Sequence, residues 1–138
     1  GGGGNNGNGK SLYLVGNTLY FGRTLLNGDE FYILNNIDPN TNLPVVASKN
    51  IENSGSNTSV NGILVRDYLA FLITNEEFQI WNINDPNNIT SYASPLTLPP
   101  GTGGGLQGTA TDCEGNYIFV GSQSSNDKGY ISVITSGP

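Results

Sequence analysis

The sequence predicts an all-β protein, and three observations support that prediction. After the first ten residues, short runs rich in β-branched and aromatic residues follow one another, separated by tight-turn dipeptides such as Gly16-Asn17. Several runs alternate with period two, so that Phe78 and Ile80 lie on one side of a strand while Gln79 and Trp81 lie on the other. No segment shows the helical spacing of apolar residues over a length that would form a stable helix.

Each predicted strand is a short run of strand-forming residues that is bounded by turn-forming residues. In chain order the runs are LYLV from Leu12, TLYFG from Thr18, EFYIL from Glu30, GILV from Gly62, YLAFLIT from Tyr68, EFQIWNI from Glu77, YIFVG from Tyr117 and YISVIT from Tyr130. Residues 1–10, GGGGNNGNGK, can bury no apolar side chain, so we predict a Gly/Asn-rich linker there.

An internal repeat organises these strands. DEFYILN at residues 29–35 returns about 47 residues later as EEFQIWN, and an Asp-Pro-Asn turn follows both copies. Upstream, the sequence comparison places Gly16–Phe21 beside Arg66–Phe71 and Gly115–Val120, and residues 129–134 supply a third copy of the later strand. Each unit therefore reads strand, tight turn, strand, polar loop, strand, Asp-Pro turn and outer strand.

Four strands in ~40–50 residues is the period of a β-propeller blade. We expect three four-stranded antiparallel blades, at about residues 11–50, 59–97 and 106–138, in a repeat region that covers residues 11–138. The third copy stops at Pro138, before its outer strand. Since closed propellers use ~4–8 blades, the expectation is a partial ring.

The repeat, roughly GNxLYF followed by EFxIxNIxDPxN, resembles the LVIVD-type β-propeller repeat of bacterial and archaeal surface proteins. The third copy, DCEGNYIFVGS from Asp112, is also similar to the propeller domains appended to bacterial prepilin-like surface proteins. This resemblance covers residues 11–138. It implies a propeller architecture and an extracellular or cell-surface location, and it carries over no catalytic motif.

The composition excludes several classes of function. A net charge of -6 with only five Lys and Arg argues against a nucleic-acid partner, which needs clustered cations. The absence of His removes the most common general base and metal ligand. The single Cys113 cannot form an intrachain disulfide, and we predict a small buried side chain there. No apolar run approaches the ~18 residues of a membrane span, so the chain is not expected to cross a membrane.

Two motifs suggest ligands, and both have a simpler interpretation. Residues 4–11, GNNGNGKS, fit the phosphate-binding pattern GxxxxGK[ST], but that loop needs a helix after it and the sequence predicts a strand. Asp38–Asn42 places oxygen side chains at alternate positions as a calcium loop does, and Asp85–Asn88 repeats only part of that pattern. We predict instead that each Asp caps a turn in which Pro fixes φ.

The carboxylates and the tryptophan are further candidate site residues. Asp29-Glu30 and Glu76-Glu77 are adjacent pairs, which point to opposite faces of a strand and therefore suit a solvated loop edge better than a glycosidase site; Asp112 with Glu114 is a third group. Trp81 is expected to pack between blades rather than to form a ligand platform.

These features predict a non-enzymatic extracellular binding, adhesion or scaffold module of a cell-surface or pilus-associated protein. No catalytic, cofactor-binding or metal-binding residues are assigned. The expected partner is a protein or a glycan at a cell surface, and exposed blade edges could pair with further strands. Two alternatives stay open: a carbohydrate-active propeller enzyme that uses Asp or Glu, and a purely structural spacer.

Overall fold

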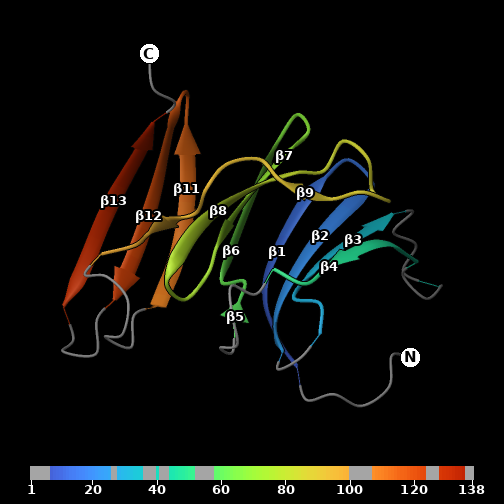
Figure 1. Cartoon of the computed structure of the whole chain (residues 1–138), viewed down its shortest axis with the longest axis horizontal. Helices are drawn as coiled ribbons and strands as arrows, with labels where there is room; N and C mark the ends of the chain where they lie inside the picture. Colours follow the sequence, from blue (N-terminus) through green and yellow to red (C-terminus); the bar gives the residue numbers. More distant parts are fainter. Residues whose placement is uncertain are drawn as a thin grey trace.

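The fold is all-β, as predicted, and consists of three antiparallel sheets (Figure 1). The computed structural model describes residues 7–25, 28–35, 40, 44–51, 58–99, 107–123 and 128–135. Every regular element in these ranges is a strand. No helix of the described chain is long and apolar enough to cross a membrane.

Each sheet is built on a meander of three or four consecutive strands, and the first two sheets add short strands to it. The first sheet has the order β1 (Asn8–Val15), β2 (Thr18–Leu25), β3 (Phe31–Asn35), β4 (Val45–Lys49), and β5 (Thr58–Ser59) pairs with the end of β2. The second contains β6 (Gly62–Arg66), β7 (Leu69–Ile73), β8 (Glu77–Asn82) and β10 (Leu96–Thr97), with β9 (Thr90–Ser91) also on β8. The third has β11 (Gln107–Glu114), β12 (Tyr117–Gln123) and β13 (Gly129–Thr135).

The first strand starts earlier than the sequence predicted. It begins at Asn8, so residues 8–10 of the predicted linker belong to β1. The reason is the length of β2, which offers backbone partners as far as Thr24, the residue that pairs with Asn8. Backbone hydrogen bonding to an existing strand outweighs the poor strand propensity of the Asn-Gly sequence.

Three equivalent turns set the register of the repeat. Each joins the first two strands of its sheet, and its first residue has a positive φ: 56° at Gly16, 54° at Asp67 and 56° at Gly115. Asp67 therefore stands where the other two copies have Gly, whereas the sequence comparison had placed Arg66 there. That alignment was wrong by one residue, because Asp tolerates the left-handed conformation and no glycine marks this turn.

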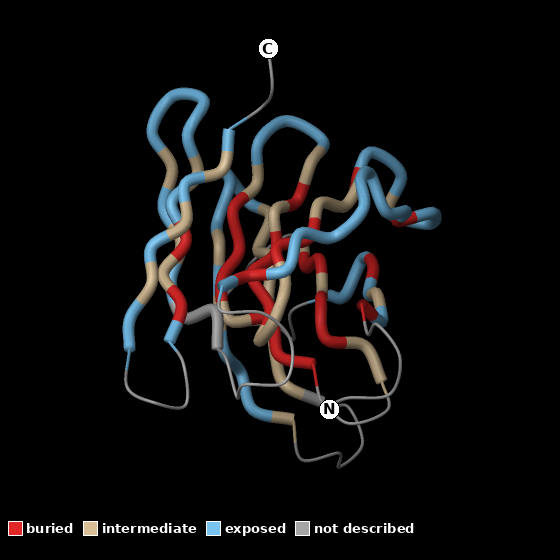
Figure 2. The backbone as a smooth tube through the Cα atoms, turned by 60° about the vertical axis from the view of Figure 1, so that its left-hand side comes forward, coloured by how far each residue is buried: buried red, intermediate tan, exposed pale blue. Residues whose placement is uncertain are grey.

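The core lies in two layers, one on each side of the second sheet. The layer against the first sheet contains the buried residues Phe31, Ile33, Ala47, Ile51, Val60, Ile63, Ala70, Leu72, Ile83 and Ile89. The layer against the third sheet contains Ile73, Phe78, Leu98 and Val120. Leu72 and Ile73 are sequence neighbours in β7 and both are fully buried, one in each layer. The second sheet thus buries both of its faces, and Figure 2 shows buried residues gathered in the middle of the molecule.

Corresponding residues lie on corresponding faces in all three sheets. We call the face of a sheet that points toward the next sheet in chain order its forward face. The opposite face, toward the preceding sheet, is its backward face. The turns make Tyr20, Phe71 and Phe119 equivalent, and these residues pair with Ile33, Ile80 and Val133. Tyr20 packs forward onto the second sheet and Phe71 forward onto the third. The three sheets are therefore stacked in one consistent orientation.

Tyr20 is held inside the first of these layers. Its ring stacks on Phe31, with centroids 6.3 Å apart and planes 9° from parallel. Burial raises the pKa of the Tyr20 hydroxyl, because the phenolate would lose its hydration.

The first strands of the three sheets converge. β6 contacts β1 and β2 on one side and β11 on the other, whereas β4 and β13 lie at opposite ends of the molecule (Figure 1). Gly62 permits the close approach of β6 and β11, since a Cβ there would lie 2.9 Å from Thr111 Cγ2. The sheets form an open stack and do not close into a ring.

Candidate functional site: a cleft between the second and third sheets

The phosphate-loop pattern lies in a strand. Of its eight residues, Asn8 to Ser11 belong to β1, and no helix follows. The Ser11 hydroxyl donates to the backbone oxygen of Val60 at 2.7 Å. This hydroxyl therefore joins two segments of the fold, and the strand prediction for the residues after the pattern is confirmed.

One of the two Asp-Pro turns can be examined. The Asp85 carboxylate accepts a hydrogen bond from the Asn87 N–H at 2.9 Å, and the Asp85 backbone oxygen accepts from the Asn88 N–H at 2.9 Å. The predicted turn-capping role of Asp85 is confirmed. In the other turn, Asp38, Pro39, Thr41 and Asn42 lie outside the described residues. Within the described ranges, no three Asp, Glu or Cys side chains form a cluster that could hold a metal ion.

The interpretation of Glu30 as part of a solvated edge is wrong. Glu30 is fully buried, and its Oε2 accepts a hydrogen bond from the Ile51 N–H at 3.0 Å. Its neighbour Asp29 accepts from the Ser48 hydroxyl near the surface. A buried carboxylate is retained when it satisfies backbone donors that would otherwise be unpaired, and this one ties β3 to the segment after β4.

Trp81 packs between the first and second sheets, as predicted. Its ring lies against the first core layer, and its Nε1–H donates to Gln79 Oε1 at 2.9 Å. The Lys49 ammonium lies 5.3 Å from the ring centroid. Because a packed and hydrogen-bonded ring of this kind offers little free surface, Trp81 is a structural residue.

A cleft of about 460 Å³ lies between the second and third sheets, and Tyr13 of β1 also reaches it. Its walls are mostly apolar and come from strands of both sheets. They are Leu64, Val65, Leu69, Phe71, Phe78, Ile80, Ile118 and Ile134, with Tyr13, Arg66, Tyr92, Cys113, Asn116 and Thr135 supplying polar atoms. Sites for small molecules and inserted side chains have this size and this balance of apolar walls with a few polar groups.

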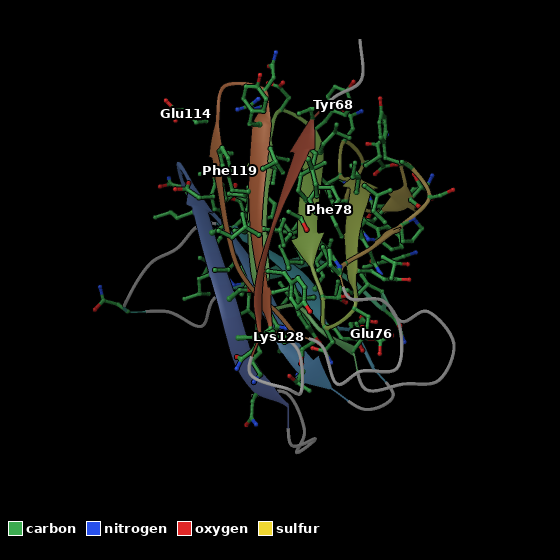
Figure 3. All side chains as sticks on the ribbon, turned by 90° about the vertical axis from the view of Figure 1, so that its left-hand side faces the viewer. Tyr68, Glu76, Phe78, Glu114, Phe119 and Lys128 are labelled. Atoms are coloured by element: carbon green, nitrogen blue, oxygen red, sulfur yellow. The ribbon has the colours of Figure 1, made fainter. Side chains whose placement is uncertain are left out.

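The polar groups of the cleft include residues at the tight-turn end of the sheets. Arg66 and Asn116 flank the turns at Asp67 and Gly115, and both are exposed. Figure 3 marks this end by Tyr68 and Glu114, and the opposite end by Lys128. A guanidinium and an amide beside apolar walls suit a ligand with an apolar body and an anionic or hydrogen-bond-accepting group. No Asp or Glu is among the lining residues.

No sequence pattern predicts this cleft. Its residues are scattered from Tyr13 to Thr135, and each belongs to an ordinary strand or turn. Cys113 was predicted to be buried in the core; it is half-buried and lines the cleft as a free thiol. The cleft is formed by residues of separate sheets, and no local pattern encodes how those sheets stack. Comparisons with family models, curated proteins and solved structures returned no match.

Proposed function

We propose that this chain is a non-enzymatic binding module made of three propeller-type blades, and that the cleft between the second and third sheets takes an apolar group of its partner. The blade assignment is supported by the meander order of each sheet and by the common orientation of equivalent residues such as Phe71 and Phe119. The contacts of β6 with both β1 and β11 also support the blade assignment, because the blades of a propeller are arranged around a central channel.

The single observation that carries the binding proposal is the cleft itself. Large apolar side chains, including Phe71 and Ile80, stay only partly buried there, although each packs against the core. Such a site gains free energy when an apolar group displaces its water. Arg66 at the cleft supplies one charge-assisted hydrogen bond and hence orientation.

The partner class favoured by this lining is a protein. Sugar hydroxyls that enter an aliphatic cleft would lose hydrogen bonds to water without replacement, whereas an apolar side chain loses none. An extracellular or cell-surface location, in a surface or pilus-associated protein, is part of the proposal and is supported by the repeat resemblance and by the Asn-rich, low-charge composition.

The test uses anilinonaphthalene sulfonate as a probe, because it combines an apolar body with an anionic group. We expect saturable binding that protects Cys113, the chain's one thiol, from alkylation. Leu69→Trp fills the cleft and should abolish binding; Tyr117 at the equivalent position of β12 shows that a strand of this type accepts a bulky aromatic there. Arg66→Gln should weaken binding about tenfold, and Lys128→Gln at the opposite end should not.

Natural partners can be sought with the same pair of proteins. Peptides selected on the wild-type domain should lose binding to Leu69→Trp, and a glycan array should stay silent. Undiminished binding of the probe and of every selected peptide to Leu69→Trp would reject the cleft as the site. Absence of any ligand would favour the spacer, and polysaccharide hydrolysis that is lost in Asp112→Asn would favour the enzyme.

A further inference from the structure

The forward face of the third sheet is apolar and uncovered. Phe31, Phe78 and Ile131 occupy equivalent positions on β3, β8 and β13, and their exposed fractions are 0%, 1% and 81%. Val133 and Phe119 on the same face are also exposed, whereas their equivalents pack between sheets. The third sheet thus keeps the side chains of an inter-sheet layer without a sheet on top of them. Figure 3 looks onto this face, with Phe119 labelled.

The backward face of the first sheet shows the converse. Leu12 on β1 pairs with Phe21 as Ile63 on β6 pairs with Leu72, so Leu12 and Ile63 are equivalent. Ile63 is 4% exposed because the first sheet covers it, and Leu12 is 64% exposed. Leu14, the equivalent of Val65, is exposed as well. This face has the apolar residues that the second sheet uses to pack on its predecessor.

We propose that a second copy of this chain docks head-to-tail, with the forward face of its third sheet on the backward face of the first sheet of its partner. The occupant follows from the chain itself. Each of its two core layers joins a forward face to a backward face. One face of each kind is left with exposed apolar side chains; on the backward face of the first sheet these lie on β1, whereas Leu34 on β3 is buried. Forward and backward faces already pack on each other twice within the chain. A second copy supplies the same kind of partner for each of the two remaining faces.

Two such contacts close a pair of copies. Together the copies hold twice the three sheets of one chain, a number within the ~4–8 blades of closed propellers. A head-to-tail contact closes when the rotation between successive copies brings the chain of contacts back to the first copy, and we take that rotation from the convergence of β1, β6 and β11 on one side of the stack. The exposed carboxylates of Asp112 and Glu114 lie on the forward face at β11, where they form the polar rim of the contact.

This inference rests on how the sheets stack, and it is independent of the cleft. The strand edge of β13 is a separate feature, because edge pairing would use backbone groups, whereas docking of the faces uses side chains such as Ile131 and Val133. Edge pairing therefore predicts that Ile131 can be replaced freely by another strand-forming residue.

The experiment is sedimentation of the full 138-residue chain and of three lysine variants. We expect the wild type to be a dimer, and Ile131→Lys and Leu12→Lys to weaken dimerisation by at least about tenfold. Lysine reduces the net charge of -6, so overall repulsion cannot explain the loss. Tyr68→Lys in an exposed turn is the matched control and should stay dimeric. Ile131→Thr, which keeps a strand-forming residue, guards against a folding defect, and circular dichroism checks the fold of each variant.

A mixture of the two variants gives the decisive result. In a mixed pair, one contact carries both lysines and the other carries none, so mixing should restore dimers that neither variant forms alone. A monomeric wild type, larger polymers, a dimer that survives Leu12→Lys, or a mixture that stays monomeric would overturn the proposal. None of these results bears on probe binding at Cys113, so failure of this inference is separable from failure of the proposed function.

Discussion

Replacing Gly22 with alanine tests a close approach between the β2 backbone and the side chains of Ser11 and Val60. A Cβ at Gly22 would lie 2.6 Å from Val60 Cγ1, 2.7 Å from Val60 Cβ, and closer still to Ser11 Oγ. The Ser11 hydroxyl can rotate away only by giving up its hydrogen bond to the Val60 oxygen, a loss of about 0.5–1.5 kcal/mol. Val60 is fully buried and β-branched, so it cannot change rotamer freely, and overpacking costs about 1–3 kcal/mol.

The lower chain entropy of unfolded alanine opposes these losses by about 0.4–1 kcal/mol. We therefore expect Gly22→Ala to lower the free energy of unfolding by about 2 kcal/mol, measured by urea titration with far-ultraviolet circular dichroism. Gly129→Ala is the matched control, because a Cβ there meets nothing within 4 Å. It should be neutral or slightly stabilising.

A double-mutant cycle identifies the cause. Val60→Ala removes the Cγ1 methyl that the new Cβ would meet at 2.6 Å and leaves a smaller side chain that can shift, although its Cβ stays; by itself it costs about 1.5–2.5 kcal/mol. The double variant Gly22→Ala with Val60→Ala should be more stable than the sum of the single effects by at least about 1 kcal/mol. Strict additivity, or a Gly22→Ala variant as stable as Gly129→Ala, would refute the proposed clash.

Three further predictions follow from equivalent positions in the sheets and from burial. Phe78→Ala should cost about 3–5 kcal/mol of unfolding free energy, and Ile131→Ala less than about 0.5 kcal/mol, both by urea titration at a protein concentration low enough to hold the chain monomeric. Folding raises the pKa of Tyr20, so the stabilisation that comes from its neutral hydroxyl is complete below pH ~10 and is lost as pH rises through the pKa of the folded state. In thermal melts, the melting temperature of Tyr20→Phe should therefore fall less steeply with pH in that range than that of the wild type. At the turn with φ 56°, Gly115→Ala should cost about 1 kcal/mol in urea titrations and Gly115→Asp less, since Asp67 adopts the equivalent conformation.

Local features of the fold could be predicted from the sequence. Period-two alternation placed Phe78 and Gln79 on opposite faces of β8, and the turn chemistry of Asp85 was correct. These succeed because strand alternation and turn capping depend on neighbours within a few residues.

Features that depend on packing between sheets were missed. Glu30 looked like a surface carboxylate, because the donor that it satisfies, the Ile51 N–H, lies 21 residues further along the chain. The register at Asp67 was misplaced because its conformation is unmarked by glycine. The cleft could not be foreseen either, since its walls come from strands of separate sheets and not from the residues of any one strand.

The position of Trp81 has a practical consequence for following unfolding. It is the only tryptophan of the chain, and it packs in the layer between the first and second sheets. The third sheet is held by the smaller layer around Phe78 and Val120, so it is the unit expected to detach first. Intrinsic fluorescence would remain native during that step, while the Cys113 thiol became reactive. If Cys113 became reactive before the Trp81 fluorescence changed, the third sheet would have detached while the first two sheets stayed folded.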